Sequence, residues 1–290
     1  MIHYIENDYL KIGVKEYGCE LTSVILKENG TEYLWQGDEK YWAGRAYNLF
    51  PICGRLISKE YTYCGKSYYL GTHGFARDSE FELLQKDENS LSFILRANEQ
   101  TRANYPFEFE YVVTYVLTDN TIKTIYSAKN LGNNKMYCSF GGHPGFNVPL
   151  GEDGVFEDYY LEFKQGSNQT EMIFKECFFT DETTPVDFEN KQLNLKHNYF
   201  DNDAHFFVDD GFSCALKSYK SNKSVTVTYP QMKYLGIWHA VKKDAPYVCI
   251  EPWTSVPSYF GKVDNIETKR DMYALEANEE VSVSFDITIE

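Results

Sequence analysis

The chain has 290 residues, 43 % hydrophobic and 24 % charged, which is ordinary for a globular protein and sufficient for one large domain or two smaller ones. Its 28 lysines and arginines stand against 43 aspartates and glutamates, so the formal net charge is −15. Such an acidic surface repels nucleic acid and anionic lipid. We therefore expect neither nucleic acid nor a membrane as a partner, and a neutral ligand is favoured over a phosphorylated one.

Cysteine usage and hydropathy indicate where the protein works. The seven cysteines are scattered, odd in number and without C-x-x-C spacing, which is typical of reduced thiols rather than of a disulfide framework or a zinc site. No signal peptide is recognisable, and no apolar run approaches the roughly 20 residues of a membrane helix. These features predict a cytoplasmic protein.

Alternation of apolar and polar residues, the period of a β-strand, dominates the chain from one end to the other. Aromatic residues reach 17 %, and they favour strands as well. Besides one short helical turn at 39–44, the pattern predicts strands at 19–26, 90–97, 109–117, 121–128, 159–163 and 281–289. Asp119-Asn120 reads as a tight hairpin turn, and 151–202 is the least strand-like region.

No linker, repeat or low-complexity segment divides the sequence. We therefore predict a single all-β domain over residues 1–290. So many antiparallel strands must curl or divide into packed sheets to cover their edges.

The most informative motif is Gly-Gly-His-Pro-Gly-Phe-Asn at 141–147. Its glycines permit backbone angles closed to other residues, and Pro144 fixes its own φ. We expect this frame to hold His143 where a strand gives way to a loop, as a general acid or base. The alternative is a histidine that simply fills the core.

A carboxylate occurs in a similar setting later in the chain. Glu251 follows the apolar run 247–250 and precedes Pro252, so it lies at a predicted strand end. Partial burial there would raise its pKa and suit it to act as a base near neutral pH. The alternative role is that of a buried ion-pair partner.

Three further side chains stand beside glycines or in apolar runs. Arg55 follows Gly54, and His73 precedes Gly74. Arg55 could instead be a surface ion-pair partner, and His73 could instead cap a turn. Trp238 could stack on a ligand or belong to the core.

Several common sites are missing from the sequence. The histidines lack H-x-x-x-H spacing and clustered carboxylates, the glycine-rich segment lacks the lysine of a P-loop, and G-x-S-x-G does not occur. We expect no metal and no cofactor.

Five motifs in this order resemble the aldose 1-epimerase (galactose mutarotase) family, and most closely its LacX-like branch, over nearly the whole chain. They are Leu-Phe-Pro-Ile-Cys-Gly-Arg at 49–55, His-Gly-Phe-Ala-Arg at 73–77, Gly-His-Pro-Gly-Phe-Asn at 142–147, Leu-Gly-Ile-Trp at 235–238 and Cys-Ile-Glu-Pro-Trp at 249–253. The resemblance implies an antiparallel β-supersandwich with an open sugar-binding cleft.

The resemblance also implies roles for individual residues. Glu251 matches the general base and His143 the general acid, while Arg55 and His73 match residues that hold the hydroxyls and ring oxygen of the sugar. Asp203 resembles the family's hydroxyl-binding aspartate, although Asp201 and Asp209 lie nearby.

The reaction implied is the interconversion of the α and β anomers of a hexose by acid–base ring opening. A hexose 6-phosphate is an alternative substrate, whose phosphate Arg77 would bind. The segment 254–258 after Trp253 departs from the usual continuation of this branch, and it motivates a third possibility, a non-catalytic sugar-binding protein. A glycoside hydrolase is disfavoured because only one carboxylate is well framed. The sequence does not reveal the oligomeric state.

Overall fold

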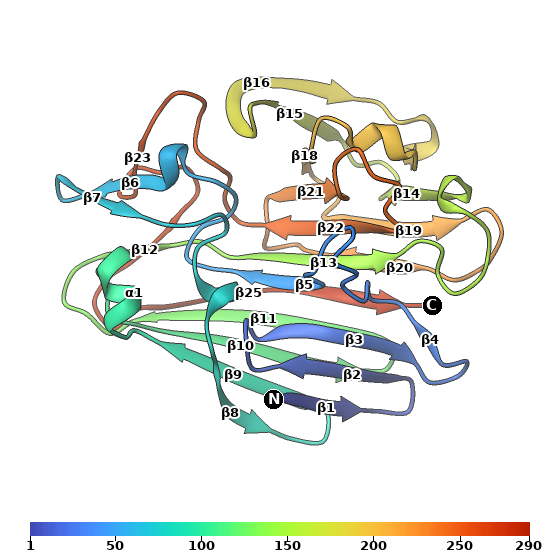
Figure 1. Cartoon of the computed structure of the whole chain (residues 1–290), viewed down its shortest axis with the longest axis horizontal. Coiled ribbons are helices and arrows are strands. Elements are labelled where there is room, and N and C mark those ends of the chain that lie inside the picture. Colours follow the sequence, from blue (N-terminus) through green and yellow to red (C-terminus); the bar gives the residue numbers. More distant parts are fainter.

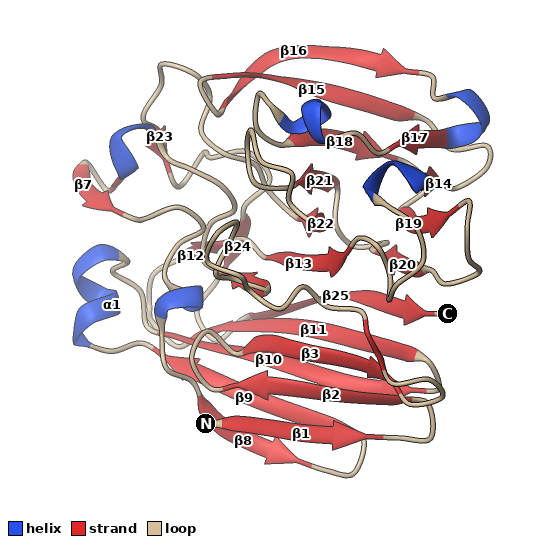
Figure 2. Ribbon diagram, turned by 45° about the vertical axis from the view of Figure 1, so that its right-hand side comes forward, coloured by secondary structure: helices blue, strands red, loops and turns tan.

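A computed structural model describes residues 1–290, and its regular elements are almost all strands joined by loops (Figure 2). The strands are β1 (Ile2–Glu6), β2 (Leu10–Lys15), β3 (Glu20–Leu26), β4 (Thr31–Glu32), β5 (Ala46–Leu49), β6 (Glu60–Tyr63), β7 (Lys66–Tyr69), β8 (Glu82–Lys86), β9 (Ser90–Arg96), β10 (Phe109–Thr118), β11 (Thr121–Asn130), β12 (Met136–Cys138), β13 (Gly141–Asn147), β14 (Tyr159–Phe163), β15 (Gln169–Lys175), β16 (Phe178–Val186), β17 (Gln192–Asn194), β18 (His205–Asp209), β19 (Ser213–Ser218), β20 (Val225–Thr228), β21 (Tyr234–Trp238), β22 (Tyr247–Trp253), β23 (Asp264–Asn265), β24 (Tyr273–Leu275) and β25 (Glu280–Ile289). The α-helix is α1 (Glu99–Asn104), and short 3₁₀ turns lie at Ile57–Lys59, Ala76–Asp78, Phe156–Asp158, Glu189–Lys191 and His197–Phe200. No helix has the length and apolar character needed to cross a membrane.

The strands form two large sheets and three small ones (Figure 1). A nine-stranded sheet has the order β17-β14-β19-β20-β25-β11-β10-β9-β8, and a seven-stranded sheet has the order β16-β15-β18-β21-β22-β13-β5. Strands β1 to β4 form a four-stranded sheet, β12 pairs with β24, and β23-β6-β7 form a small sheet. Every strand pair is antiparallel except β23 with β6.

A core of 61 buried residues joins the sheets. Aromatic contacts are prominent in it, for example the stacked rings of Phe50 and Tyr111, whose centroids are 4.2 Å apart. Phe285 of β25 approaches Gly142 of β13, so the nine-stranded sheet covers the back of the seven-stranded one. Burying one such aromatic side chain stabilises the fold by about 1.5–3 kcal/mol.

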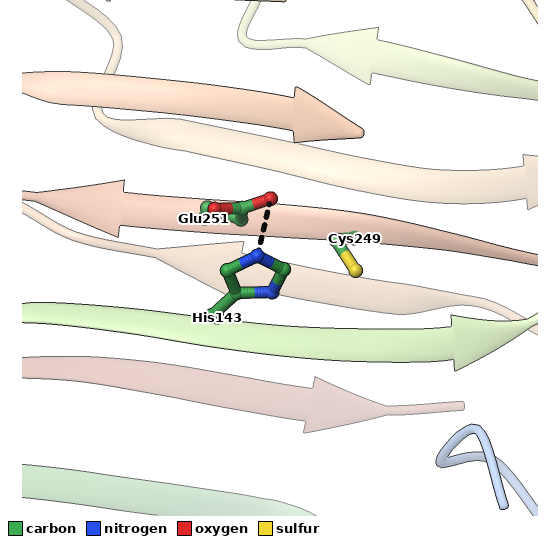
Figure 3. A group of neighbouring side chains, drawn as sticks. All are labelled: His143, Cys249 and Glu251. Atoms are coloured by element: carbon green, nitrogen blue, oxygen red, sulfur yellow. Dashed lines mark ion pairs between the residues drawn. The ribbon is translucent and has the colours of Figure 1, made fainter. Parts of the chain in front are cut away.

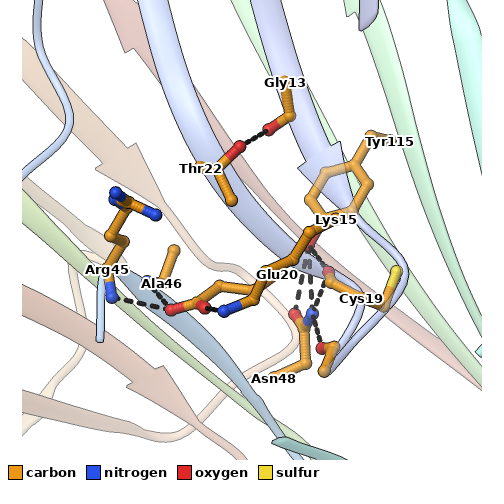
Figure 4. Close-up of polar contacts among 10 residues, drawn as sticks. Gly13, Lys15, Cys19, Glu20, Thr22, Arg45, Ala46, Asn48 and Tyr115 are labelled. Carbon is orange, nitrogen blue, oxygen red and sulfur yellow. Dashed lines mark hydrogen bonds and ion pairs between the residues drawn. The ribbon is translucent and has the colours of Figure 1, made fainter. Parts of the chain in front are cut away.

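A buried polar cluster attaches β5 to the N-terminal sheet (Figure 4). The carboxylate of Glu20 accepts hydrogen bonds from the backbone N–H groups of Arg45 at 2.6 Å and Ala46 at 3.0 Å, and it pairs with Lys15. The amide of Asn48 donates to the Cys19 carbonyl at 2.6 Å. These bonds fix the strand that carries one wall of the site described below, and they compensate the desolvation of the buried groups.

The all-β class predicted from the sequence is confirmed, and the predicted strands coincide with β3, β9, β10, β11, β14 and β25 within two residues at each end. Asp119-Asn120 forms the expected two-residue hairpin. Two predictions were wrong. Residues 39–44 form a turn without helix, and the region 151–202 contains the long strands β15 and β16. β16 is the exposed edge of its sheet, so its residues are polar and the alternation is lost.

Candidate active site

The centre of the seven-stranded sheet brings His143 and Glu251 together. β13 and β22 pair in antiparallel fashion with Gly145 opposite Cys249, and the same register places His143 opposite Glu251. Side chains of such a cross-strand pair share one face and start about 5 Å apart. Strand pairing alone therefore makes these two residues neighbours, although 108 positions separate them in the chain.

The ladder between the two strands is interrupted at this point. Paired residues occur on either side of His143 and Glu251 but not between them. Pro144 and Pro252 follow the two residues directly, and neither can donate a backbone hydrogen bond. The two prolines thus mark the place where the ladder between β13 and β22 lacks hydrogen bonds, at His143 and Glu251.

Gly236 of β21 lies on the other side of Glu251. A Cβ atom at this position would stand 2.8 Å from the ring of Phe206 and 3.2 Å from the Cβ of Glu251. The lack of a side chain lets β21 pack closely against Phe206 and Glu251. We call His143, Glu251 and Gly236 the floor of the site.

The glycines around His143 serve a different purpose from the one expected. None of Gly141, Gly142 and Gly145 has a positive φ, and His143 lies inside β13 rather than at a boundary with a loop. The expectation about unusual backbone angles was wrong. These glycines provide space: a Cβ at Gly142 would stand 2.7 Å from Phe285, and one at Gly145 would stand 3.0 Å from Trp42.

His143 and Glu251, which we call the floor pair, are buried and in contact with each other (Figure 3). His143 Nε2 lies 3.3 Å from Glu251 Oε1, and the two residues are 8 % and 2 % exposed. Burial lowers the pKa of His143 to about 3 and raises the pKa of Glu251 well above its usual range, with a further upward contribution from Asp203. Desolvation therefore favours a neutral imidazole beside a protonated carboxyl in the free protein.

Two tryptophans hold the imidazole of His143 in place. The ring of Trp42 lies 4.9 Å from it, and that of Trp238 meets it edge-on at 5.6 Å. The Nδ1 atom of His143 is buried without a hydrogen-bond partner. The ring is thus positioned by aromatic packing and by Glu251 alone.

His73 has a tautomer that the structure defines. Its backbone adopts φ +67°, and its Nδ1 accepts a hydrogen bond from the N–H of Gly54 at 3.1 Å. An accepting Nδ1 requires the proton to be on Nε2 when the ring is neutral. Burial lowers the pKa of His73 well below its usual value, and the nearby His143 lowers it further. His73 is therefore a neutral donor through Nε2–H.

Arg55 and Asp203 face each other across the opening. Nη1 of Arg55 lies 3.5 Å from Oδ2 of Asp203, and the same oxygen is 3.0 Å from the Sγ of Cys177. Asp203 has φ +90°, and Cys177 has φ +65°. We call Arg55, His73, Asp203 and Cys177 the rim of the site.

The floor and the rim enclose one cavity of about 490 Å³. All seven residues singled out in the sequence line it: Arg55, His73, Arg77, His143, Asp203, Trp238 and Glu251. Arg77 lies over the ring of Tyr47 at 5.0 Å, and its Nε is 3.3 Å from Asp78. A cavity of this size admits a small ligand, with aromatic surfaces and a few polar groups that converge on it.

The family model for aldose 1-epimerase matches residues 1–288. The chain belongs to the aldose 1-epimerase family. It is 34 % identical to the plasmid-encoded protein LacX of Lactococcus lactis over 98 % of each chain. A galactose mutarotase related enzyme from Lactobacillus acidophilus superposes with a TM-score of 0.95 at 33 % identity, over 100 % of this chain and 97 % of that one. A galactose mutarotase-like protein from Lactobacillus casei gives 0.94 at 30 % identity over the whole of both chains.

In this aldose 1-epimerase family member, the sequence did not single out several cleft residues. Trp42 and Tyr47 lie before and within β5, and Glu176 and Cys177 form the turn between β15 and β16. Aromatic residues are too frequent in this chain for two of them to stand out. Glutamate and cysteine are not residues that a tight turn favours, so no local signal marks positions 176 and 177.

The segment 254–258, which follows Trp253, forms hydrogen bonds with the backbone around Arg55. The backbone N–H of Ser258 donates to the carbonyl of Arg55 at 2.9 Å, and Ser258 Oγ accepts from the N–H of Ile57 at 3.2 Å. The same hydroxyl donates to Asp264 at 2.6 Å, and Asp264 pairs with the buried Lys269 at 3.1 Å. The segment 254–258 thus forms part of the support for Arg55.

His143, Cys249 and Glu251 also offer donor atoms that lie within 4.8 Å of one another. Nitrogen, sulfur and oxygen donors of this kind bind zinc. His143 Nε2 already faces Glu251 Oε1 at 3.3 Å, and this pair accounts for the arrangement without a metal.

Proposed function

We propose that this protein interconverts the α and β anomers of a free hexose, with Glu251 as the general base and His143 as the general acid. The observation that carries the proposal is the contact between His143 Nε2 and Glu251 Oε1, 3.3 Å apart at the bottom of the cleft. Membership of the aldose 1-epimerase family supports a sugar epimerase reaction. The scattered cysteines favour the cytoplasm as its location.

Ring opening needs one group that takes a proton and one that gives a proton. The base removes the proton of the C1 hydroxyl, the acid protonates the ring oxygen, and the C1–O5 bond breaks to give the open-chain aldehyde. Rotation about C1–C2 followed by the reverse proton transfers closes the ring as the other anomer. No proton, electron or atom is gained or lost over the cycle.

The floor pair can supply both groups without exchanging protons with water. A neutral imidazole beside a protonated carboxyl holds as many protons as an imidazolium beside a carboxylate, so a single transfer across the 3.3 Å contact prepares the acid and the base. Burial favours the neutral pair in the free protein. Polar hydroxyl groups of a bound sugar would stabilise the charged pair that starts the reaction.

The rim would orient the sugar. The neutral Nε2–H of His73 can donate to a sugar oxygen, and Arg55 and Asp203 can bind hydroxyl groups, as their counterparts do by resemblance. Trp238 offers an aromatic face for stacking. We assign these four residues to substrate binding, together with Arg77 at the edge of the cavity.

A neutral hexose fits the charges of the cleft better than a hexose 6-phosphate. The guanidinium of Arg55 already faces Asp203, and Arg77 faces Asp78. Glu176 adds a further acidic group to the lining. A phosphate would therefore have to displace a carboxylate partner from either arginine.

Polarimetry of freshly dissolved α-D-glucose and α-D-galactose tests the proposal. We expect the wild type to accelerate the change in rotation and Glu251→Gln to abolish the acceleration while still binding the sugar in calorimetry. Glu280→Gln, at an exposed position of β25, is the matched control and should keep full activity. Absence of acceleration with any common aldose would refute the proposal, and faster conversion of glucose 6-phosphate than of glucose would overturn the choice of substrate.

A further inference from the structure

The turn between β15 and β16 has an unusual composition for its shape. Lys175 and Phe178 are paired, so Glu176 and Cys177 form a two-residue hairpin loop. Their φ angles are +52° and +65°. A type I′ turn requires positive φ at both central positions and favours Asn-Gly, because other L-residues are strained there. Glu176 and Cys177 are therefore not the residues that this type of turn favours.

The tip of this hairpin is held against the cleft rather than free in solvent. The backbone N–H of Phe179, two residues after Cys177, donates to the carbonyl of Ser258 at 2.9 Å, and the N–H of Phe260 donates to the carbonyl of Phe179 at 2.8 Å. Glu176 and Cys177 both line the cavity. The strained pair is therefore fixed where a ligand would bind, and strain retained at such a place indicates a role in function.

Cys177 contacts a residue of the rim. Its Sγ lies 3.0 Å from Oδ2 of Asp203, the oxygen that also faces Arg55 at 3.5 Å. Burial raises the pKa of the Cys177 thiol and the Asp203 carboxylate raises it further, so the sulfur retains its proton and donates it to the carboxylate. Both of these contacts fall on Oδ2, which leaves Oδ1 of this cavity-lining residue without a hydrogen bond to the protein.

We propose that Cys177 is a positioning residue for sugar binding, which fixes the carboxylate of Asp203 so that Oδ1 meets a hydroxyl of the substrate. The inference rests on the proposed function for the identity of the ligand. This role makes the hairpin tip part of the sugar-binding wall. It also gives a reason for a cysteine at a position where glycine would be less strained.

Three substitutions at this position test the role. Cys177→Ala removes the donor, and we expect the KM and the Kd for the hexose to rise about tenfold, the effect of one hydrogen bond to a charged group, with kcat within twofold of the wild type. Cys177→Ser restores a donor and should recover most of the affinity. Cys177→Gly should raise the Tm by relieving strain and yet weaken sugar binding as the alanine variant does.

A higher Tm together with weaker sugar binding in Cys177→Gly is a result that a cysteine with only a structural role would not give. Lys191→Gly is the matched control, since Lys191 has φ +59° in another turn and does not line the cavity. It should raise the Tm without changing KM or Kd. Unchanged KM and Kd in Cys177→Ala, or a loss confined to kcat, would overturn the inference. The Kd measured by calorimetry tests the role of Cys177 even if the wild type shows no turnover. Absence of turnover would refute the proposed function without deciding the role of Cys177.

Discussion

The floor and the rim of the cleft are built in different ways. His143, Glu251 and Gly236 lie on regular extended strands, and none has a positive φ. On the rim, His73, Asp203 and Cys177 all have positive φ, and Arg55 follows a glycine with φ +76°.

Strand register fixes the floor, whereas loops that are held by distant segments fix the rim. Register positions side chains rigidly, as proton transfer requires, and loops can differ between relatives without disturbing the sheet. The comparison therefore predicts that changes at the floor affect turnover and that changes at the rim affect binding.

The largest effect is expected from the floor pair. Glu251→Gln and His143→Gln should each lower kcat by about 10²- to 10⁴-fold, the usual contribution of general acid–base catalysis. Because the two groups share one mobile proton, the double variant should be no slower than the slower single variant. Polarimetric rates of all three variants check this, and multiplied losses would show that the two groups act independently.

The sequence singled out His143 and Glu251, which the structure brings together in one cleft, but part of the reasoning was wrong. The glycines drew attention to His143 because of their conformational freedom, whereas the structure uses them as space against Phe285 and Trp42. Only the packing of β13 on its neighbours reveals this. The prediction succeeded because a closely packed strand and a strained loop both require glycine.

The rim was harder to predict because tertiary contacts define it. Among the three candidate aspartates, Asp209 is buried and accepts a hydrogen bond from Tyr229 at 2.8 Å, while Asp203 lines the cavity. Resemblance to the family selected Asp203, and the local sequence did not. Cys177 reaches Asp203 across 26 positions of the chain, so no local pattern could have indicated the contact.

Glycine substitutions should distinguish the two regions next. Gly74, beside His73, has φ +76°, and a Cβ there would stand 2.2 Å from the carbonyl oxygen of Phe50. Gly74→Ala should therefore lower the free energy of unfolding by about 3 kcal/mol or more. Gly142→Ala, on the strand that carries the floor, should cost about 1–3 kcal/mol because its obstacle is a side chain.

A second substitution distinguishes the backbone clash at Gly74 from the side-chain clash at Gly142. Phe285→Leu removes the ring that a Cβ at Gly142 would meet, so the double variant should be more stable than the sum of the single costs predicts. No trimmed side chain can rescue Gly74→Ala, because the obstacle is backbone. Denaturant unfolding measures both, and full rescue at Gly74 by trimming Phe50 would contradict the distinction.

A histidine outside both regions predicts how stability depends on pH. His239 is buried, its Nδ1 donates to the carbonyl of Ala240 at 2.8 Å, and burial lowers its pKa to about 4. The unfolded chain binds this proton below about pH 6.5, so stability is complete above that pH and falls as the pH drops toward 4, by roughly 3 kcal/mol. His239→Gln should reduce the pH dependence of unfolding and leave mutarotation unchanged. An unaltered slope would show that other groups, such as His73, carry it.

The smallest effect is expected at His73, where the comparison is tested most directly. Asparagine tolerates positive φ, and its side-chain oxygen can accept from the N–H of Gly54 as Nδ1 does, so His73→Asn should preserve the turn. It would remove the Nε2–H donor from the cleft. Under the proposed function that donor orients the sugar and does not transfer the proton, so KM should rise about tenfold while kcat changes little. A loss of kcat as large as that of Glu251→Gln, measured at saturating hexose, would place His73 among the proton-transfer groups and remove the division between floor and rim.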